Sequence, residues 1–266
     1  MNEIKYISSV QNALVKQFLS LKEKSRERKK TGFFVVEGLR EIQLCLRGNY
    51  EITTLLFYAD IISHEEVIEL VQEEPIRLIA ISKEVYQKLA YRETTEGIMA
   101  IVSAKAHGLE ALQLRQNPLI LIAEAPEKPG NIGALLRTAD AANLDAVIIA
   151  NPKSDLYNPN IIRSSVGCVF TTNIALGTTM DIVQFLQERQ IKIFCAALSA
   201  SKKYTSVDYK QASAIVVGTE ATGLTPPWLE NSTQNIIIPM EGEIDSMNVS
   251  VAAAILLFEA KRQRSL

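Results

Sequence analysis

The pattern of apolar and polar positions predicts a first region in which helices and strands alternate. Residues 10–30 carry apolar side chains at helical spacing, with charged residues between and after them. A strand-like run at 33–36 follows, Gly38 ends it, and residues 39–47 again show helical spacing. The alternation continues to a last strand at 97–104. The pattern therefore predicts a small α/β domain.

From residue 118 onward, short and continuously apolar segments alternate with helical ones. Continuous apolar strands separated by helices are typical of a parallel sheet that is covered on both faces. We therefore predict an α/β fold with two domains, residues 1–106 and 107–266. The expected strands of the second domain are LILIAEA, AVIIA, IKIFCAAL, AIVVG and NIIIPM, and the expected helices are 131–143, one after Asn158-Pro159, 180–189 and a long one from about Ser246.

Composition excludes several classes of protein. Of the 266 residues, 47% are hydrophobic, which is enough for a packed core. No apolar run reaches the roughly 18 residues of a spanning helix, and the amphipathic N-terminus lacks a signal core. We therefore expect a cytoplasmic protein without a membrane partner. The cysteines are far apart in the sequence, which predicts reduced core thiols: Cys45, Cys168 and Cys195. The histidines, His64 and His107, are also isolated, so we expect no metal site.

The net charge of −2 conceals a polarised distribution. Residues 1–50 hold ten basic and five acidic side chains, whereas residues 51–105 hold five basic and ten acidic ones. The run KEKSRERKK at 22–30 has six positive charges and two negative ones. Such a run is typical of a surface that docks a phosphate backbone, and the alternative is a solvated helix face. The candidate RNA-binding residues are Arg26, Arg28, Lys29 and Lys30.

Ligand sites in open α/β sheets lie at the carboxyl ends of strands, so the strand-to-helix turns are the candidate sites. The first turn reads PEKPGNIGALLRTA, and in it Asn131 is expected at the N-cap of a helix. Arg137 is followed by Ala139 and Ala142 and is expected within or beside a buried face, where it needs an anionic partner. The partner is either a ligand phosphate or carboxylate, or a structural ion pair.

Two further turns carry candidate chemistry. In VVGTEATGL, Gly218 and Gly223 surround Glu220, and glycines let a backbone approach a ligand closely. A tight structural turn explains these glycines equally well. In IPMEGEIDSMNVS, a polar loop ends at Ser246 and Asn248, which open the final helix. Helix capping alone explains one polar side chain but does not need Ser246, Asn248 and Ser250 together, and the alternative for Ser250 is an ordinary helix position.

Together, the three turns resemble the three motifs of the SpoU family of RNA ribose 2′-O-methyltransferases, which belong to the knotted SPOUT class. The matching stretches are PGNIGALLRTA, VVGTEATGL and IPMEGEIDSMNVSVAAAILLFE, in the family's order and separation. The stretch SVQNALVKQFLSLKEKSRERKKTGFFVVEGLRE is similar to the family's RNA-binding domain, a small α/β fold related to certain ribosomal proteins.

The resemblance implies a trefoil knot over about 193–260 and S-adenosylmethionine bound in it, mainly by backbone groups. It also implies a homodimer formed through the C-terminal domain. The implied cofactor-binding residues are Leu198, Gly218, Ile238, Met240 and Met247, and Glu220 and Ser246 line the same site.

For catalysis, the resemblance gives Arg137 a central role. Because the pKa of a free arginine lies above about 12, we prefer a phosphate clamp to a general base. Asn131 would orient Arg137 or the ribose, and Glu220 and Asn248 would hold the sugar or position the cofactor side of the loop.

The sequence thus predicts methyl transfer from S-adenosylmethionine to a ribose 2′-hydroxyl of rRNA or tRNA. One alternative is a non-catalytic RNA-binding scaffold, which would be expected to have lost Arg137, Glu220 or Asn248, and none is lost. Another is a knotted enzyme that methylates a base.

Overall fold

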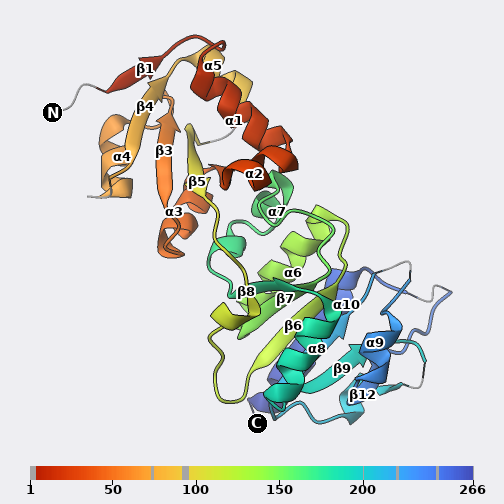
Figure 1. The fold of residues 1–266 in the computed structure, drawn as a ribbon. Helices are drawn as coiled ribbons and strands as arrows, with labels where there is room; N and C mark the ends of the chain where they lie inside the picture. Colours follow the sequence, from red (N-terminus) through yellow and green to blue (C-terminus); the bar gives the residue numbers. More distant parts are fainter. Residues whose placement is uncertain are drawn as a thin grey trace. The chain divides into compact units, whose positions relative to one another are not determined.

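The computed structural model describes residues 4–72, 75–91, 96–199, 201–219, 222–243 and 246–265. The chain forms two compact units, whose elements are labelled in Figure 1. The first unit contains residues 1–105 and 155–171, and the second contains 106–154 and 172–266. The predicted boundary after residue 106 lies beside the first crossing between units. The apolar pattern gave no sign that 155–171 belongs with the N-terminal residues.

Within the described residues, the first unit has a five-stranded mixed sheet with the order β1-β4-β3-β5-β2. β4 pairs in parallel with β1 and β3, whereas β5 pairs antiparallel with β3 and β2. The strands are β1 (Lys5–Ile7), β2 (Phe33–Glu37), β3 (Ile52–Phe57), β4 (Arg77–Ile81) and β5 (Ile98–Ser103). The helices are α1 (Ala13–Glu23), α2 (Ser25–Thr31), α3 (Leu39–Arg47), α4 (His64–Val71) and α5 (Lys83–Leu89).

The helical pattern over 10–30 forms two helices rather than one. The Asn12 side chain caps α1 by accepting a hydrogen bond from the Leu14 N–H, and α1 ends where Lys24 is extended. α2 ends at Gly32, whose φ of 70° favours glycine. Arg28 of α2 is buried, although its basic neighbours are exposed. The break at Lys24 therefore separates an amphipathic helix from a basic one.

The segment 155–171 packs into the first unit through one ion pair and a group of aromatic rings. The Arg28 Nε donates to Asp155 Oδ2 at 2.5 Å, and the two side chains are 4% and 10% exposed. Tyr157 stacks on Phe34 with ring centroids 4.0 Å apart. Phe34 and Tyr157, with Tyr50 and Phe170, form what we call the aromatic cluster. The helix expected after Asn158-Pro159 is confirmed as α7 (Pro159–Ser164).

The second unit confirms the prediction of a parallel sheet. In the part of the chain that the structure describes, its seven strands run in the order β10-β12-β9-β11-β6-β7-β8, and every neighbouring pair is parallel. Residues of β6, β7 and β11 are buried along their full length. The strands are β6 (Leu119–Glu124), β7 (Ala146–Ala150), β8 (Ile174–Gly177), β9 (Lys192–Ala196), β10 (Lys202–Lys203), β11 (Ser213–Val217) and β12 (Gln234–Ile237).

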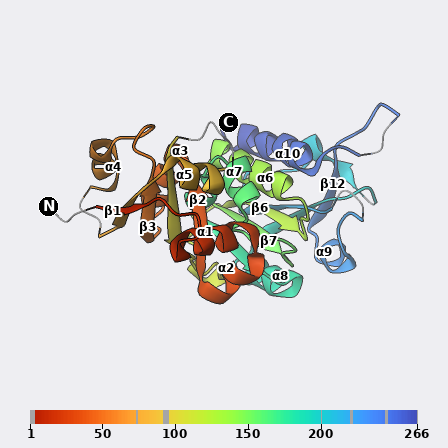
Figure 2. The ribbon, with the colours of Figure 1, turned by 90° about the horizontal axis from the view of Figure 1, so that it is seen from above.

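Helices cover both faces of this sheet. α6 and α10 pack together on one face, and α8 and α9 lie on the other (Figure 2). α10 begins three residues after the expected start at Ser246, because Asn248 is its N-cap. The helices are α6 (Pro129–Ala141), α8 (Thr179–Glu188), α9 (Pro226–Glu230) and α10 (Val249–Arg264).

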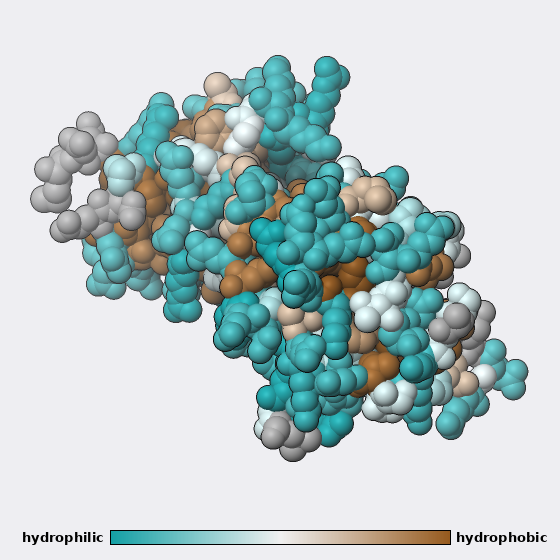
Figure 3. Space-filling model, turned by 60° about the horizontal axis from the view of Figure 1, so that its bottom comes forward, coloured by the Kyte–Doolittle hydropathy of each residue, from teal (hydrophilic) through white to brown (hydrophobic). Residues whose placement is uncertain are grey.

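The three cysteines are buried and unbridged, as predicted: Cys45, Cys168 and Cys195. Among the described residues, no helix has the length and apolar character needed to cross a membrane. The face of the molecule drawn in Figure 3 is covered largely by hydrophilic side chains.

Replacing Asp155 tests how strongly the segment 155–171 is held. Asp155→Ala leaves the Arg28 guanidinium buried without its carboxylate. Removing one partner of a buried pair costs about 3–5 kcal/mol, so we expect that loss in the free energy of unfolding, measured by urea denaturation. The exposed Glu65→Ala serves as the control and should change stability by less than about 0.5 kcal/mol. Equal stabilities of the two variants would contradict this role of the pair.

Candidate active site

One cavity lies at the carboxyl edge of the parallel sheet in the second unit. Because parallel strands end at the same edge, the residues that follow β9, β11 and β12 meet there. The cavity has a volume of about 500 Å³. The structure brings all five predicted cofactor residues to it, together with Ser246: Leu198, Gly218, Ile238, Met240 and Met247.

The walls of this cavity are mainly apolar. Leu198 stands at the rim with 72% of its surface exposed, although a leucine is normally buried. None of the described lining residues carries a charge. Polar groups come from hydroxyls and from the backbone at the strand ends. Such a site suits a ligand with a flat apolar part and hydrogen-bonding edges.

The glycines of the second motif close a tight loop. A Cβ on Gly218 would lie 2.3 Å from the backbone C and O of Gly223, so only glycine fits without a shift. Thr219 and Gly223 exchange both backbone hydrogen bonds, at 3.0 and 3.3 Å, and Gly223 has a φ of 65°. The turn itself therefore requires these glycines. Glu220, which the sequence placed in this site, lies outside the described residues.

Asn131 and Asn248 join the first and third motifs. The Asn248 Nδ2 donates to Asn131 Oδ1 at 3.0 Å, while Asn248 Oδ1 accepts from the Ser250 N–H at 3.0 Å. Asn248 thus caps α10 and binds α6 at once. The prediction that Asn131 is an N-cap is wrong: Lys128 holds that position and Pro129 starts the helix, so Asn131 lies in the first turn.

Arg137 is exposed, so of the two predicted placements it does not lie within the buried face of α6 but beside it. The neighbouring Leu136 and Ala139 are buried, and so is Gly133, which lies one turn before Arg137 on the same side of α6. Arg137 lies about 9 Å along the helix axis from Asn131. Arg137 forms no hydrogen bond or ion pair with any of the described residues, so the alternative of a structural ion pair has no partner among them. Its guanidinium remains available to an external anion.

Glu124, a buried carboxylate at the end of β6, is not among the predicted site residues. It is 3% exposed, and it accepts hydrogen bonds from the Thr225 N–H at 2.8 Å and the Thr225 hydroxyl at 2.6 Å. The Thr179 hydroxyl donates to it at 3.2 Å. Glu124 therefore ties the chain that follows Gly223 to the strand of the first motif. The available signal was an acidic residue that ends an otherwise apolar strand.

The predicted RNA-binding residues separate into two groups. Arg26, Lys29 and Lys30 are exposed on α2 in the first unit. Arg28 is 5% exposed and also donates to the Leu21 carbonyl at 2.6 Å. It therefore holds the interior of the unit together and has no surface to offer to RNA.

The fold and site define an α/β protein with a ligand cavity at the carboxyl edge of a parallel sheet. A family model for the SpoU rRNA Methylase family matches residues 118–258, and one for the MRM3-like substrate binding domain matches residues 12–100. The chain therefore belongs to the SpoU rRNA methylase family.

Relatives resemble the chain over almost its full length. A 23S rRNA (guanosine(2553)-2′-O)-methyltransferase of Bacillus subtilis (strain 168) is 29% identical, with 97% of this chain and 100% of the relative covered. A 23S rRNA (uridine(2479)-2′-O)-methyltransferase of Streptomyces viridochromogenes is 27% identical, with 95% of this chain and 91% of the relative covered. The AdoMet-bound rRNA methyltransferase from Sinorhizobium meliloti superposes with a TM-score of 0.90 at 25% identity, covering 97% and 98%.

The close approach at Gly218 can be tested by adding one methyl group. Gly218→Ala forces the loop apart, so we expect a loss of about 1–3 kcal/mol in the free energy of unfolding, measured by urea denaturation. Gly130→Ala is the matched control, because a Cβ on this helical residue meets open space. It should leave stability unchanged or raise it by up to about 1 kcal/mol. A Gly218 variant as stable as the control would contradict the tight loop.

Proposed function

We propose that this protein is an S-adenosylmethionine-dependent enzyme that methylates a ribose 2′-hydroxyl of RNA. The observation that carries the proposal is the single cavity in which Leu198, Gly218, Ile238, Met240 and Met247 meet, at the edge of a parallel sheet. Family membership and the names of the relatives support it, since these relatives are 2′-O-methyltransferases of rRNA.

The cavity fits the cofactor. Its volume of about 500 Å³ lies within the range of about 300–1,000 Å³ that is usual for small-ligand sites. The exposed Leu198 and the apolar walls offer surface for an adenine ring, and the strand ends offer backbone N–H and C=O groups for its edges. S-adenosylmethionine, when bound, supplies the activated methyl group. The similar rRNA methyltransferase from Sinorhizobium meliloti is an AdoMet-bound structure.

On the RNA side, Arg137 is the phosphate clamp of the proposed mechanism. A ribose hydroxyl is a poor nucleophile at neutral pH, so transfer requires that its proton be lost, here to solvent, that it be held in line and that developing negative charge be stabilised. The exposed guanidinium binds the phosphate beside the target ribose and stabilises the alkoxide as it forms. Asn131 and Asn248, joined by their hydrogen bond, orient the ribose. Glu220 is proposed to hold the sugar or the cofactor side of its loop.

The substrate class is ribosomal RNA in this proposal, with tRNA as the alternative. Two relatives that match over nearly the whole chain are named for 23S rRNA, and a third, from Synechocystis, is named for tRNA/rRNA. A tRNA (guanosine(18)-2′-O)-methyltransferase of Escherichia coli (strain K12) is 35% identical but matches only 58% of this chain. The N-terminal unit, with its substrate-binding family match, is proposed to recognise the RNA.

We further propose that the second unit contains the family's trefoil knot and forms a cytoplasmic homodimer. α10 supports the dimer, because Val251 and Phe258 are each 50% exposed. These two residues are seven apart, so they lie on one face of the helix. A second copy of α10 would cover this apolar face.

Arg137→Ala separates cofactor binding from methyl transfer. Arg137 lies outside the cavity lining, so we expect S-adenosylmethionine affinity within about twofold of wild type by calorimetry. Formation of 2′-O-methylnucleoside in digested rRNA should fall by at least about 100-fold, as for other lost transition-state donors. Loss of cofactor binding would refute the clamp, and a methylated base as product would refute ribose methylation.

Charge reversal on α2 tests the RNA surface. In the variant with Arg26→Glu, Lys29→Glu and Lys30→Glu, we expect weaker RNA binding and a shallower dependence of affinity on salt, because fewer counterions are released. The control reverses three exposed basic residues elsewhere in the first unit: Arg77, Lys83 and Lys88. An equal effect of both triple variants on the salt slope would contradict a specific role for α2.

A further inference from the structure

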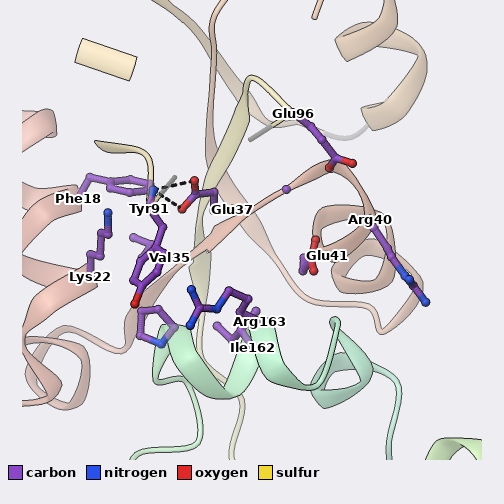
Figure 4. A pocket seen from close by; sticks show the side chains of 12 residues that line it. Phe18, Lys22, Val35, Glu37, Arg40, Glu41, Tyr91, Glu96, Ile162 and Arg163 are labelled. Atoms are coloured by element: carbon purple, nitrogen blue, oxygen red, sulfur yellow. Dashed lines mark hydrogen bonds between the residues drawn. The ribbon is translucent and has the colours of Figure 1, made fainter. Parts of the chain in front are cut away.

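A second cavity, of about 330 Å³, lies in the first unit (Figure 4). Its lining comes from two distant stretches of sequence, because α7 contributes Pro159, Ile162 and Arg163 while the remaining walls come from residues 18–96. The segment 155–171 therefore completes this cavity. None of its residues takes part in the active site described above.

One wall of this cavity is a flat, cationic surface. The Tyr91 ring is 48% exposed, the Arg163 guanidinium carbon lies 4.2 Å from its centroid, and the Lys22 Nζ lies 5.5 Å from it. Figure 4 shows the Arg163 side chain extending toward Tyr91. Aromatic rings and guanidinium planes are the surfaces on which unpaired RNA bases stack.

The other wall holds three carboxylates, of which two are engaged. Glu37 accepts from the Tyr91 N–H at 2.9 and 3.1 Å, and Glu96 accepts from the Leu39 N–H. The half-buried Glu41 carboxylate accepts no hydrogen bond from any other residue in the described ranges. Arg40 points away from Tyr91 and Arg163 in Figure 4. Among the described residues, the Glu41 carboxylate is thus held only by its own backbone N–H, and its remaining acceptor capacity faces the cavity.

The environment of Glu41 favours a ligand that donates hydrogen bonds. Burial raises the pKa of Glu41, its own backbone N–H and Arg40 lower it in part, and the nearby Glu96 and Glu37 raise it further. Neighbouring negative charge makes the ionised form costly, so a donor placed against this carboxylate is stabilising.

We propose that this cavity binds one unpaired guanine of the substrate RNA. Its base stacks on the Tyr91–Arg163 pair, Glu41 accepts from guanine N1–H and N2–H, and Lys22 faces the adjacent phosphate. Guanine is the standard base with two adjacent donors on one edge, which match the two oxygens of a carboxylate. Adenine and cytosine place an acceptor beside their amino group, and that acceptor repels the carboxylate. This inference rests on the proposed function, because it assumes an RNA substrate.

Short RNAs test the site in the full-length protein. The probes are three heptamers, UUUGUUU, UUUAUUU and the same sequence with inosine at the centre, which lacks N2–H. We expect the guanine heptamer to bind at least about tenfold tighter than the adenine one by fluorescence anisotropy, with inosine between them. In the Glu41→Gln variant, the preference for the guanine heptamer over the adenine heptamer should fall below about threefold, because an amide offers only one acceptor oxygen.

Matched variants separate recognition from folding. Glu69→Gln removes an exposed carboxylate from the same unit and should keep the preference. Thermal unfolding of Glu41→Gln should occur no lower than in wild type, since the variant removes a disfavoured charge. Tyr91→Leu should weaken the binding of all three heptamers. Tyr91→Phe keeps the stacking surface and should leave their binding unchanged.

The proposal is overturned if the heptamers bind alike, if none binds, or if Glu41→Gln retains the guanine preference. A parallel assay of 2′-O-methylnucleoside formation on rRNA keeps the two proposals apart. Absence of ribose methylation in wild type would refute the proposed function even if guanine preference is observed. Ribose methylation without guanine preference would refute only this pocket.

Discussion

The buried ion pair between Arg28 and Asp155 is the contact on which the organisation of the chain depends. An arginine at that depth needs a carboxylate, and the one it finds is 127 residues away in sequence. The aromatic cluster closes beside it through the stacking of Tyr157 on Phe34. Together they place 155–171 in the first unit, so the chain crosses between units three times.

In the second unit, the parallel sheet determines where the loops that follow its strands lie. Since all its described strands run the same way, each of β9, β11 and β12 delivers its following loop to one edge. The second and third motifs therefore line one cavity. Glu124, the last residue of β6, holds the loop after Gly223 by accepting a hydrogen bond from the Thr225 N–H. The hydrogen bond between Asn248 and Asn131 connects the start of the final helix to the first motif.

Much of this arrangement could be predicted from the sequence, because it rests on local patterns. Apolar runs identified β6, β7 and β11, and Asn158-Pro159 located α7. Contacts between residues that are distant in sequence could not be predicted from such local patterns. Within a run of basic residues, nothing marked Arg28 as the buried one, since its partner is remote. The alanines after Arg137 indicated a buried face, and the structure shows that Arg137 lies exposed beside that face and not within it.

The three crossings also order the events of synthesis. Residues 1–105 leave the ribosome well before Tyr157 and Phe170. The rings of Phe34 and Tyr50 therefore cannot make their contacts with these two residues until the later segment has been synthesised. During that interval β6, α6 and β7 of the second unit emerge. The N-terminal unit therefore cannot finish folding as an independent first domain, and the usual order in which domains mature one after another does not apply to this chain.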